Sequence, residues 1–192
     1  MKRILPLLIL MTAGASLRAQ TGYYNVTQLS FLIAEENASS PIRSNMAPSV
    51  ANISGYRFNE FVSMGVGIGM TALSYPIFPL FVDLRTSLVK GSFGPVVVVK
   101  GGYSFANSKK EIFPNEYYNV GYKNRGGVML NPEIGIKMPM TERADFMLTI
   151  GYWYQHVSSD MKDKGGYNSY YQSHTRSSDL SRLSFSVSFM FK

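Results

Sequence analysis

Residues 61–71, FVSMGVGIGMT, alternate between apolar and small side chains more strictly than any other stretch of the chain. Every second residue from Val62 to Met70 is apolar, and the residues between them are Ser or Gly. Successive side chains of a strand point to opposite faces, so this strand has one apolar face and one nearly bare face. A row of glycines on the face away from the core is unusual in a β-sandwich. A narrow barrel explains it, because small interior residues on one strand leave room for large ones on another.

The same period of two returns throughout the chain, whereas a helical period of 3.6 is almost absent after residue 20. Eight segments follow it: 22–33, 48–58, 61–71, 80–88, 95–106, 128–138, 146–155 and 181–192. At about 9–12 residues they exceed the usual strand and match the length with which a tilted strand crosses a bilayer. We therefore predict an all-β fold, an up-and-down antiparallel barrel of eight transmembrane strands.

The connections between these segments nearly alternate in length. Three are long and polar, near residues 34–47, 107–125 and 158–179, and three are tight, near residues 59–60, 90–94 and 139–144. Barrels of the outer membrane have long extracellular loops at one end and short periplasmic turns at the other. The pattern predicts that both termini of the barrel lie at the end with the short turns, in the periplasm.

The N-terminal residues 1–19, MKRILPLLILMTAGASLRA, have a basic start, an apolar stretch and a small residue at the end. This is typical of a secretory signal peptide, and the apolar stretch is short for a membrane-spanning helix. Residues 20–192 then form a single domain. Without the three basic residues of the leader the net charge falls from +7 to +4, and the remaining Lys and Arg are scattered, so we expect no nucleic-acid partner.

Five charged residues occupy the strand face opposite the apolar residues: Asp83, Arg85, Lys100, Glu133 and Lys137. The interior of an eight-stranded barrel has room for side chains and little else, so acids and bases placed there must pair. We predict that these five residues form a polar network inside the barrel. Aromatic residues cluster toward the strand ends and predict girdles at two membrane interfaces: Tyr23, Tyr24, Tyr56, Phe58, Phe61, Phe78, Tyr103, Phe105, Tyr152, Trp153, Tyr154, Phe189 and Phe191.

A resemblance to a known family rests on several of these stretches. The end of the chain, LSFSVSFMFK, resembles the terminal strand of bacterial outer-membrane proteins, with Lys192 added after the aromatic Phe191. The segments ISGYRFNEFVSMGVGIGM, PIFPLFVDLR, VVVKGGYSF, GGVMLNPEIGIKMPM and FMLTIGYWYQ are similar to small outer-membrane β-barrel domain proteins of the Bacteroidetes, with a barrel like that of OmpX or OmpA. The resemblance implies an outer-membrane location, contact with lipid and lipopolysaccharide, and recognition of the last strand by the barrel-assembly machinery.

Sequence signals for chemistry are weak. His156 lies near Ser158, Ser159 and Asp160, so a Ser, His and Asp trio can be drawn, but such residues are abundant in the polar loops by composition alone. No cysteine occurs, the two histidines do not have the spacing of metal ligands, and Asp160, Asp163 and Asp179 are expected in a solvated loop. We predict no catalytic residue, no metal and no cofactor. The triplets Asn25-Val26-Thr27, Asn37-Ala38-Ser39 and Asn52-Ile53-Ser54 match the glycosylation pattern, which is uninformative if the host is bacterial.

The long connections carry tyrosines among small polar and basic residues, a composition that suits binding surfaces. The candidate loop surface comprises Tyr117, Tyr118, Tyr122, Tyr167, Tyr170 and Tyr171. Either the loops bind a ligand or host molecule, or they are passive and their basic residues contact the outer leaflet. We predict a monomeric, non-enzymatic outer-membrane barrel with a structural or surface-interaction role. Two alternatives are a narrow channel for small apolar solutes and a soluble periplasmic barrel or sandwich that binds a ligand.

Overall fold

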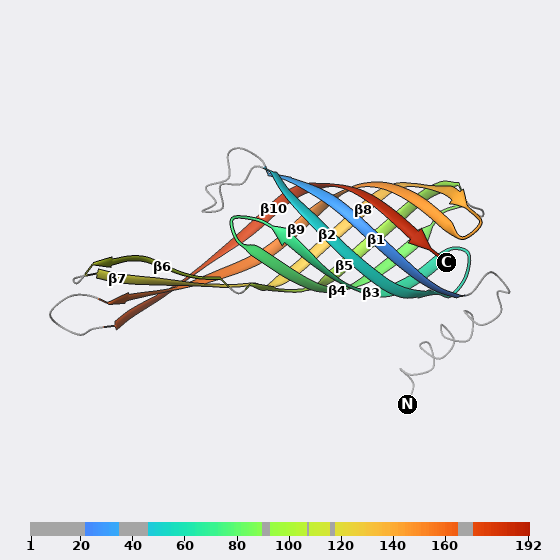
Figure 1. Cartoon of the computed structure of the whole chain (residues 1–192). Coiled ribbons are helices and arrows are strands. Elements are labelled where there is room, and N and C mark those ends of the chain that lie inside the picture. Colours follow the sequence, from blue (N-terminus) through green and yellow to red (C-terminus); the bar gives the residue numbers. More distant parts are fainter. Residues whose placement is uncertain (1–21, 35–45, 90–92, 107, 116–117, 165–170) are drawn as a thin grey trace, which may run out of the picture.

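The structure is a computed structural model that describes residues 22–34, 46–89, 93–106, 108–115, 118–164 and 171–192 (Figure 1). All regular structure in this part of the chain is β-strand. No helix there has the length and apolar character needed to span a membrane. The strands are β1 (Gly22–Ala34), β2 (Met46–Arg57), β3 (Val62–Ala72), β4 (Pro76–Ser87), β5 (Gly94–Ala106), β6 (Ser108–Asn115), β7 (Tyr118–Arg125), β8 (Val128–Thr141), β9 (Ala144–Lys164) and β10 (Tyr171–Phe191). The predicted signal peptide, residues 1–19, lies outside the described residues.

Eight of these strands close into a barrel. The antiparallel pairs run from β1 through β5, then to β8, β9 and β10, and the pairing of β10 with β1 closes the cylinder. The prediction of an all-β, eight-stranded antiparallel barrel is confirmed. Following cross-strand partners once around the barrel from Gly22 leads to Leu32, an offset of ten residues. Such an offset tilts the strands steeply, and an eight-stranded cylinder of this kind has an interior that side chains fill.

The two ends of the barrel differ. The turn end holds Gly22, Phe191 and the short turns at residues 58–61 and 142–143. At the extension end, β9 and β10 continue beyond the barrel, β7 pairs with β9 from Asn119–Lys164 to Arg125–Ser158, and β6 pairs with β7. These four strands form a protruding sheet, the extension, at the left of Figure 1.

The prediction that residues 107–125 and 158–179 are loops is wrong. Most of these residues belong to β6, β7, β9 and β10. Their sequences lack the apolar alternation by which the barrel strands were recognised, and the backbone pairing that joins them leaves no such period in the sequence. The third long connection, residues 34–47, lies largely outside the described residues, and its described ends, Ala34 and residues 46–47, belong to β1 and β2.

The alternation in β3 divides exterior from interior as predicted. Val66 points outward and is 61% exposed, whereas Gly67 is buried. A Cβ atom on Gly67 would lie 2.5 Å from ring atoms of Phe81, and one on Gly55 would lie 2.6 Å from the ring of Tyr24. Glycines on β2 and β3 therefore leave the space that aromatic rings from β1 and β4 occupy inside the barrel.

Most of the predicted girdle aromatics are on the exterior. Those with large exposed fractions are Tyr23, Tyr56, Phe58, Phe61, Phe78, Tyr103, Phe105, Tyr152 and Phe191. Tyr24 and Trp153 are a correction, because both are buried inside the barrel. Each has the interior parity of its strand, and this parity overrides the preference of an aromatic ring for an interface.

Candidate functional site in the barrel interior

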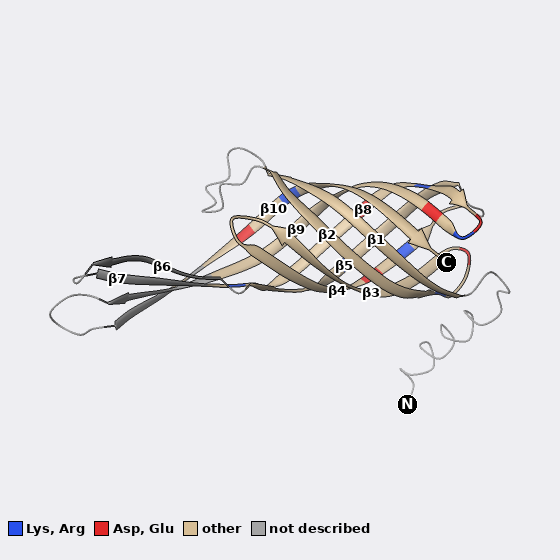
Figure 2. Cartoon of the chain, viewed as in Figure 1, with Lys and Arg blue, Asp and Glu red and all other residues tan. Residues whose placement is uncertain are grey.

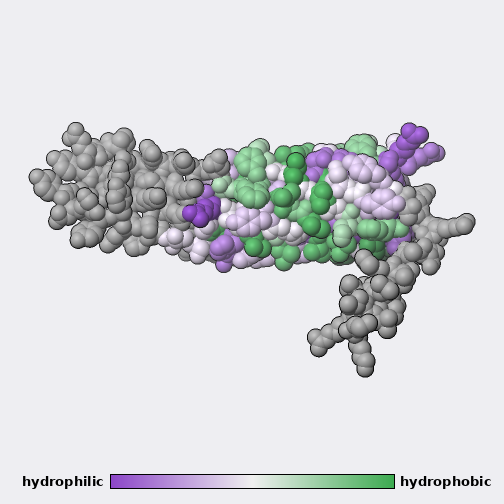
Figure 3. Space-filling view, turned by 90° about the horizontal axis from the view of Figure 1, so that it is seen from below, coloured by the Kyte–Doolittle hydropathy of each residue, from purple (hydrophilic) through white to green (hydrophobic). Residues whose placement is uncertain are grey.

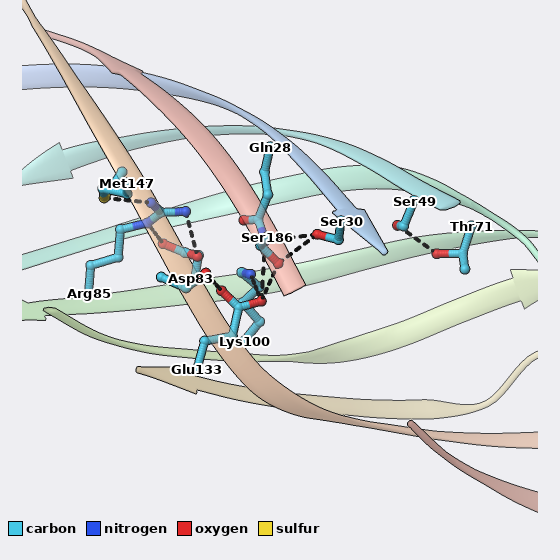
Figure 4. A network of polar contacts seen from close by, with 11 residues as sticks. Gln28, Ser30, Ser49, Thr71, Asp83, Arg85, Lys100, Glu133, Met147 and Ser186 are labelled. Atoms are coloured by element: carbon cyan, nitrogen blue, oxygen red, sulfur yellow. Dashed lines mark hydrogen bonds and ion pairs between the residues drawn. The ribbon is translucent and has the colours of Figure 1, made fainter. Parts of the chain in front are cut away.

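Glu133 on β8 is the centre of a buried polar network half-way along the barrel (Figure 4). Its Oε1 accepts hydrogen bonds from Lys100 Nζ at 2.6 Å, Gln28 Nε2 at 3.2 Å and Ser186 Oγ at 3.3 Å. Its Oε2 accepts one from Thr149 Oγ1 at 2.8 Å. The four donors come from β5, β1, β10 and β9, so one carboxylate joins five of the eight barrel strands.

Asp83 and Arg85 are neighbours on the interior face of β4, and they form a second buried ion pair. Arg85 Nε donates to Asp83 Oδ1 at 2.6 Å, and Nη2 donates to Oδ2 at 3.2 Å. The guanidinium thus holds both carboxylate oxygens, and Nη1 also contacts Met147 Sδ at 3.6 Å. Asp83 lies directly opposite Lys100 in the register of β4 and β5, which places the two ion pairs side by side.

Lys137, the fifth predicted residue, is buried in the interior but stands apart from the other four. Its Nζ donates to Ser87 Oγ at 3.2 Å, near the turn end. The network predicted around five residues therefore contains four of them, with Lys137 in a separate layer. Lys137 also lines a small pocket at this end, together with Arg57, Ser63 and Glu60.

A further ion pair at the turn end was not foreseen from the sequence. Asp145 is fully buried, its Oδ1 accepts a hydrogen bond from Lys192 Nζ at 2.8 Å, and its Oδ2 is 4.0 Å from Arg57 Nη2. The backbone N–H of Lys192 donates to the carbonyl of Arg143. The residue that follows the terminal aromatic is thus bound to the barrel through both its side chain and its backbone.

The extension end of the interior is filled by apolar side chains. They are Leu32, Ala47, Ile77, Trp153, Val157 and Leu180, with Leu73 and Tyr75 packed against them. Beside them, Ser104 Oγ donates to Gln155 Oε1 at 2.6 Å, and Gln155 Nε2 donates to the carbonyl of Gly127 at 3.0 Å. A second apolar cluster, which includes Tyr24, Phe81 and Met147, packs alongside the network with side chains from β1, β4 and β9. Buried side chains therefore pack through most of the described interior, and a small pocket remains at the turn end.

Outside the barrel, beyond the exposed aromatics of the extension end, His156 pairs with Asp179. The two residues are register partners on β9 and β10, and His156 Nδ1 lies 2.7 Å from Asp179 Oδ1. This hydrogen bond, followed by one from the hydroxyl of Tyr154, lowers the pKa of the Asp179 carboxyl. Among the described residues, no serine hydroxyl is hydrogen-bonded to His156. No cluster of metal-ligating side chains is found in the same part of the chain.

Three of the six candidate loop tyrosines fall on strands of the extension. Tyr118 and Tyr122 belong to β7, and Tyr171 begins β10. Tyr117, Tyr167 and Tyr170 lie outside the described residues. The proposal of a binding surface built by these six residues stays a prediction.

Sequence reasoning missed the neutral members of the network, namely Gln28, Ser30, Thr149 and Ser186. Each has the interior parity of its strand, which was a usable signal. Their grouping around Glu133 depends on the offset of ten residues around the barrel, and the sequence carries no mark of that offset.

A closed eight-stranded antiparallel barrel with an apolar exterior and a packed polar interior is the architecture of small outer-membrane barrel proteins. The fold is similar to the crystal structure of the outer membrane protein OprG from Pseudomonas aeruginosa, with a TM-score of 0.61 and 11% sequence identity over 92% of this chain and 98% of that chain. The solution structure of outer membrane protein W from E. coli matches with a TM-score of 0.38 and 9% identity, over 91% and 100% of the two chains. The sequence itself matches no family model and no curated protein. The Bacteroidetes affiliation and the specific OmpX or OmpA likeness stay predictions.

Proposed function

We propose that the protein is an outer-membrane barrel without a through-channel, which anchors the extension at the cell surface. The observation that carries this proposal is the exterior of the cylinder. Apolar residues gather around the middle of the barrel, with hydrophilic residues concentrated toward its ends (Figure 3). A soluble monomer rarely exposes so large an apolar surface to water. The belt is therefore proposed to face the hydrocarbon of a bilayer.

The height of the belt supports a bilayer. On β3 the exterior residues from Val62 to Met70 are apolar, and aromatic residues lie beyond them toward both ends of the barrel, such as Phe61 and Phe78. Eight residue steps of a strand cover about 26 Å. The tilt of the strands reduces the height that this length spans, and the flanking aromatics extend it. The apolar height therefore agrees with the hydrocarbon band of about 25 Å in known barrels. Charged residues are sparse along the cylinder (Figure 2), and those with interior parity are paired or hydrogen-bonded.

The interior argues against the channel, and the exterior argues against the soluble binding protein. A channel for apolar solutes requires a continuous lumen, whereas the network around Glu133 and the apolar cluster around Trp153 fill the described interior. A soluble binding protein would have to expose Val66, Ile68 and Ile134 to water, all more than half exposed. Outer-membrane lipid and lipopolysaccharide are the partners that the belt would meet, and the barrel-assembly machinery would read the last strand, with Phe191 facing outward.

The part of the molecule left to carry a specific role is the extension. Its four strands project away from the barrel and hold the candidate tyrosines of β7 and β10. Backbone pairing restricts the chain more than an unpaired loop does, which lowers the entropic cost of binding and favours a surface-interaction role over a passive one. The proposed role is non-enzymatic: the barrel anchors, and the extension binds.

The first test is membrane fractionation combined with gel mobility before and after heating. The proposed barrel sediments with outer membranes and, in detergent, migrates differently when boiled. Recovery in the soluble fraction with no heat-dependent shift would refute the membrane placement.

The second test addresses orientation and closure. The chain has no cysteine, so the single substitutions Ser177→Cys in the extension and Asn59→Cys in a short turn can be labelled cleanly. In intact cells an impermeant maleimide should label Ser177→Cys, and it should label Asn59→Cys only after permeabilisation. Purified protein in planar bilayers should give no steady conductance, whereas regular open-channel steps would contradict the absence of a pore.

A further inference from the structure

The seam between β1 and β2 carries the one polar cluster that the described belt contains near its middle. Two sequence triplets build it: Asn25-Val26-Thr27 and Asn52-Ile53-Ser54. Polar residues two positions apart point to the same face of a strand, which here is the exterior, while Val26 and Ile53 are fully buried. We call Asn25, Thr27, Asn52 and Ser54 the amide patch.

The register brings the two triplets together. Asn25 lies opposite Ser54, and Thr27 lies opposite Asn52. The amides of Asn25 and Asn52 exchange hydrogen bonds, each Nδ2 donating to the other Oδ1 at 3.1 Å. Asn25 Nδ2 also donates to Ser54 Oγ at 3.0 Å, and Asn52 Nδ2 donates to Thr27 Oγ1 at 3.4 Å.

The patch reaches the middle of the belt. Asn52 is four residues from the rim residue Tyr56, which is about 10 Å of height for a tilted strand. Its register partner on β3 is Ile68, 63% exposed, and Leu29 and Val50 continue the same face toward the extension end. On the opposite side of the cylinder the exterior of β8 is apolar at Ile134 and Ile136. The polar surface is therefore local to one seam.

The hydrogen bonds within the patch leave equal numbers of donors and acceptors unused. Both N–H groups of each amide are used, whereas each amide oxygen accepts one bond and keeps a second lone pair. The hydroxyl of Thr27 accepts one bond, and that of Ser54 accepts two, from Asn25 and from the hydroxyl of Tyr23 at 3.1 Å; among the described residues neither hydroxyl donates a hydrogen bond. Two unused donors and two unused acceptors thus face outward. Hydrocarbon offers them no hydrogen-bond partner.

A second copy of the same surface supplies what the patch lacks. Two barrels in one membrane are related by a two-fold axis along the membrane normal, and a self-complementary patch is what such an axis requires. The hydroxyl hydrogens of one copy can then meet the amide oxygens of the other. The short side chains of the patch, between longer ones such as Leu29 and Ile68, also allow close approach.

We propose that the amide patch is the interface of a homodimer within the membrane, formed by the β1–β2 seams of two copies. This replaces the monomer expected from the sequence. The proposal rests on the membrane placement proposed above, because in water the patch would need no partner.

Cysteine cross-linking in native membranes tests the dimer. Ile68→Cys lies beside the patch without altering it, and Ile134→Cys is a matched control of similar exposure, 63% against 57%, on the opposite side of the barrel. A short bismaleimide should give a product of twice the chain mass with Ile68→Cys, at least fivefold more than with Ile134→Cys. Adding Asn25→Leu and Asn52→Leu to Ile68→Cys should reduce that product at least fivefold, while the heat-dependent mobility of the barrel is kept.

Five results would overturn the dimer. Equal cross-linking at both positions would indicate random collision, and a product of another mass would indicate a different partner protein. No product from a heat-modifiable barrel would mean that lipid covers the patch, and a product unaffected by the two leucines would mean that the amides do not form the contact. Absence of the protein from the outer membrane would refute the membrane placement itself, and the dimer with it; the heat-mobility readout separates this failure from the others.

Discussion

Glu133→Gln is the substitution that most sharply probes the interior network. It keeps the shape of the side chain and one acceptor oxygen but removes the charge that faces Lys100 Nζ at 2.6 Å. Both residues are only 4% exposed, so the ammonium group cannot turn to solvent. Asp83 lies opposite Lys100, but both of its oxygens already accept hydrogen bonds from Arg85, so it replaces Glu133 only in part as a partner of Lys100.

The expected loss follows from leaving one charge buried and unpaired. Removing one partner of a buried pair costs about 3–5 kcal/mol of the free energy of unfolding, and the retained amide oxygen places Glu133→Gln near 3 kcal/mol. Removing both charges, with Glu133→Gln and Lys100→Met together, should cost less than the single change, since no charge is then left unpaired. The coupling free energy between the two sites should therefore exceed about 1.5 kcal/mol.

The chain provides its own probe for this measurement. Trp153 is the only tryptophan and is 4% exposed, so its fluorescence reports the loss of the barrel interior. Urea unfolding in lipid vesicles, followed by this signal, gives the four free energies of the cycle. A loss below about 1 kcal/mol for Glu133→Gln, or a double variant less stable than the single one, would refute the reasoning about the buried pair.

Three further predictions concern the exterior, the packing and the extension end. Val66→Arg should lower the free energy of unfolding in vesicles by about 2–4 kcal/mol whereas Val66→Leu should be nearly neutral, and equal stability of the two variants in urea unfolding would contradict a lipid-facing Val66. Gly67→Val should cost about 1–3 kcal/mol through its clash with Phe81, and Phe81→Ala should relieve that clash, so additive losses in the double variant would argue against the close contact. The pKa of the Asp179 carboxyl should lie below its usual range, so the stabilisation from its pairing with His156 is present above that range and is lost as the pH falls through the depressed pKa. His156→Ala should return that pKa toward the ordinary value in an NMR titration, and an unchanged titration would disprove the pairing.

The faces of the barrel strands could be predicted from the sequence because alternation is a local property. Val66, Leu84 and Ile136 are all exposed on the exterior, as their parity in strands 61–71, 80–88 and 128–138 indicated. The rule failed where residue type was given more weight than parity, as for Tyr24 and Trp153, whose rings are interior.

Two features could not be predicted, for different physical reasons. The extension carries no apolar ladder, and the backbone pairing that joins its strands leaves no period in the sequence, so residues 107–125 are predicted as loop although most of them belong to β6 and β7. The partners of a given interior residue depend on the register of every strand between them. The grouping of Gln28 with Glu133, 105 positions apart, and the separation of Lys137 from Glu133 both follow from that register.

The central claim is that hydrocarbon surrounds the exterior of the barrel, and spin labels along β3 test it most directly. Labels on single cysteines at Met64, Val66, Ile68 and Met70 would be exposed in turn to oxygen, which dissolves in lipid, and to a water-soluble nickel complex. The structure predicts high oxygen and minimal nickel accessibility at Val66 and Ile68, with nickel accessibility rising toward both ends of the strand. Strong relaxation by nickel at Val66 and Ile68 would show that water meets this face, and would contradict the membrane placement.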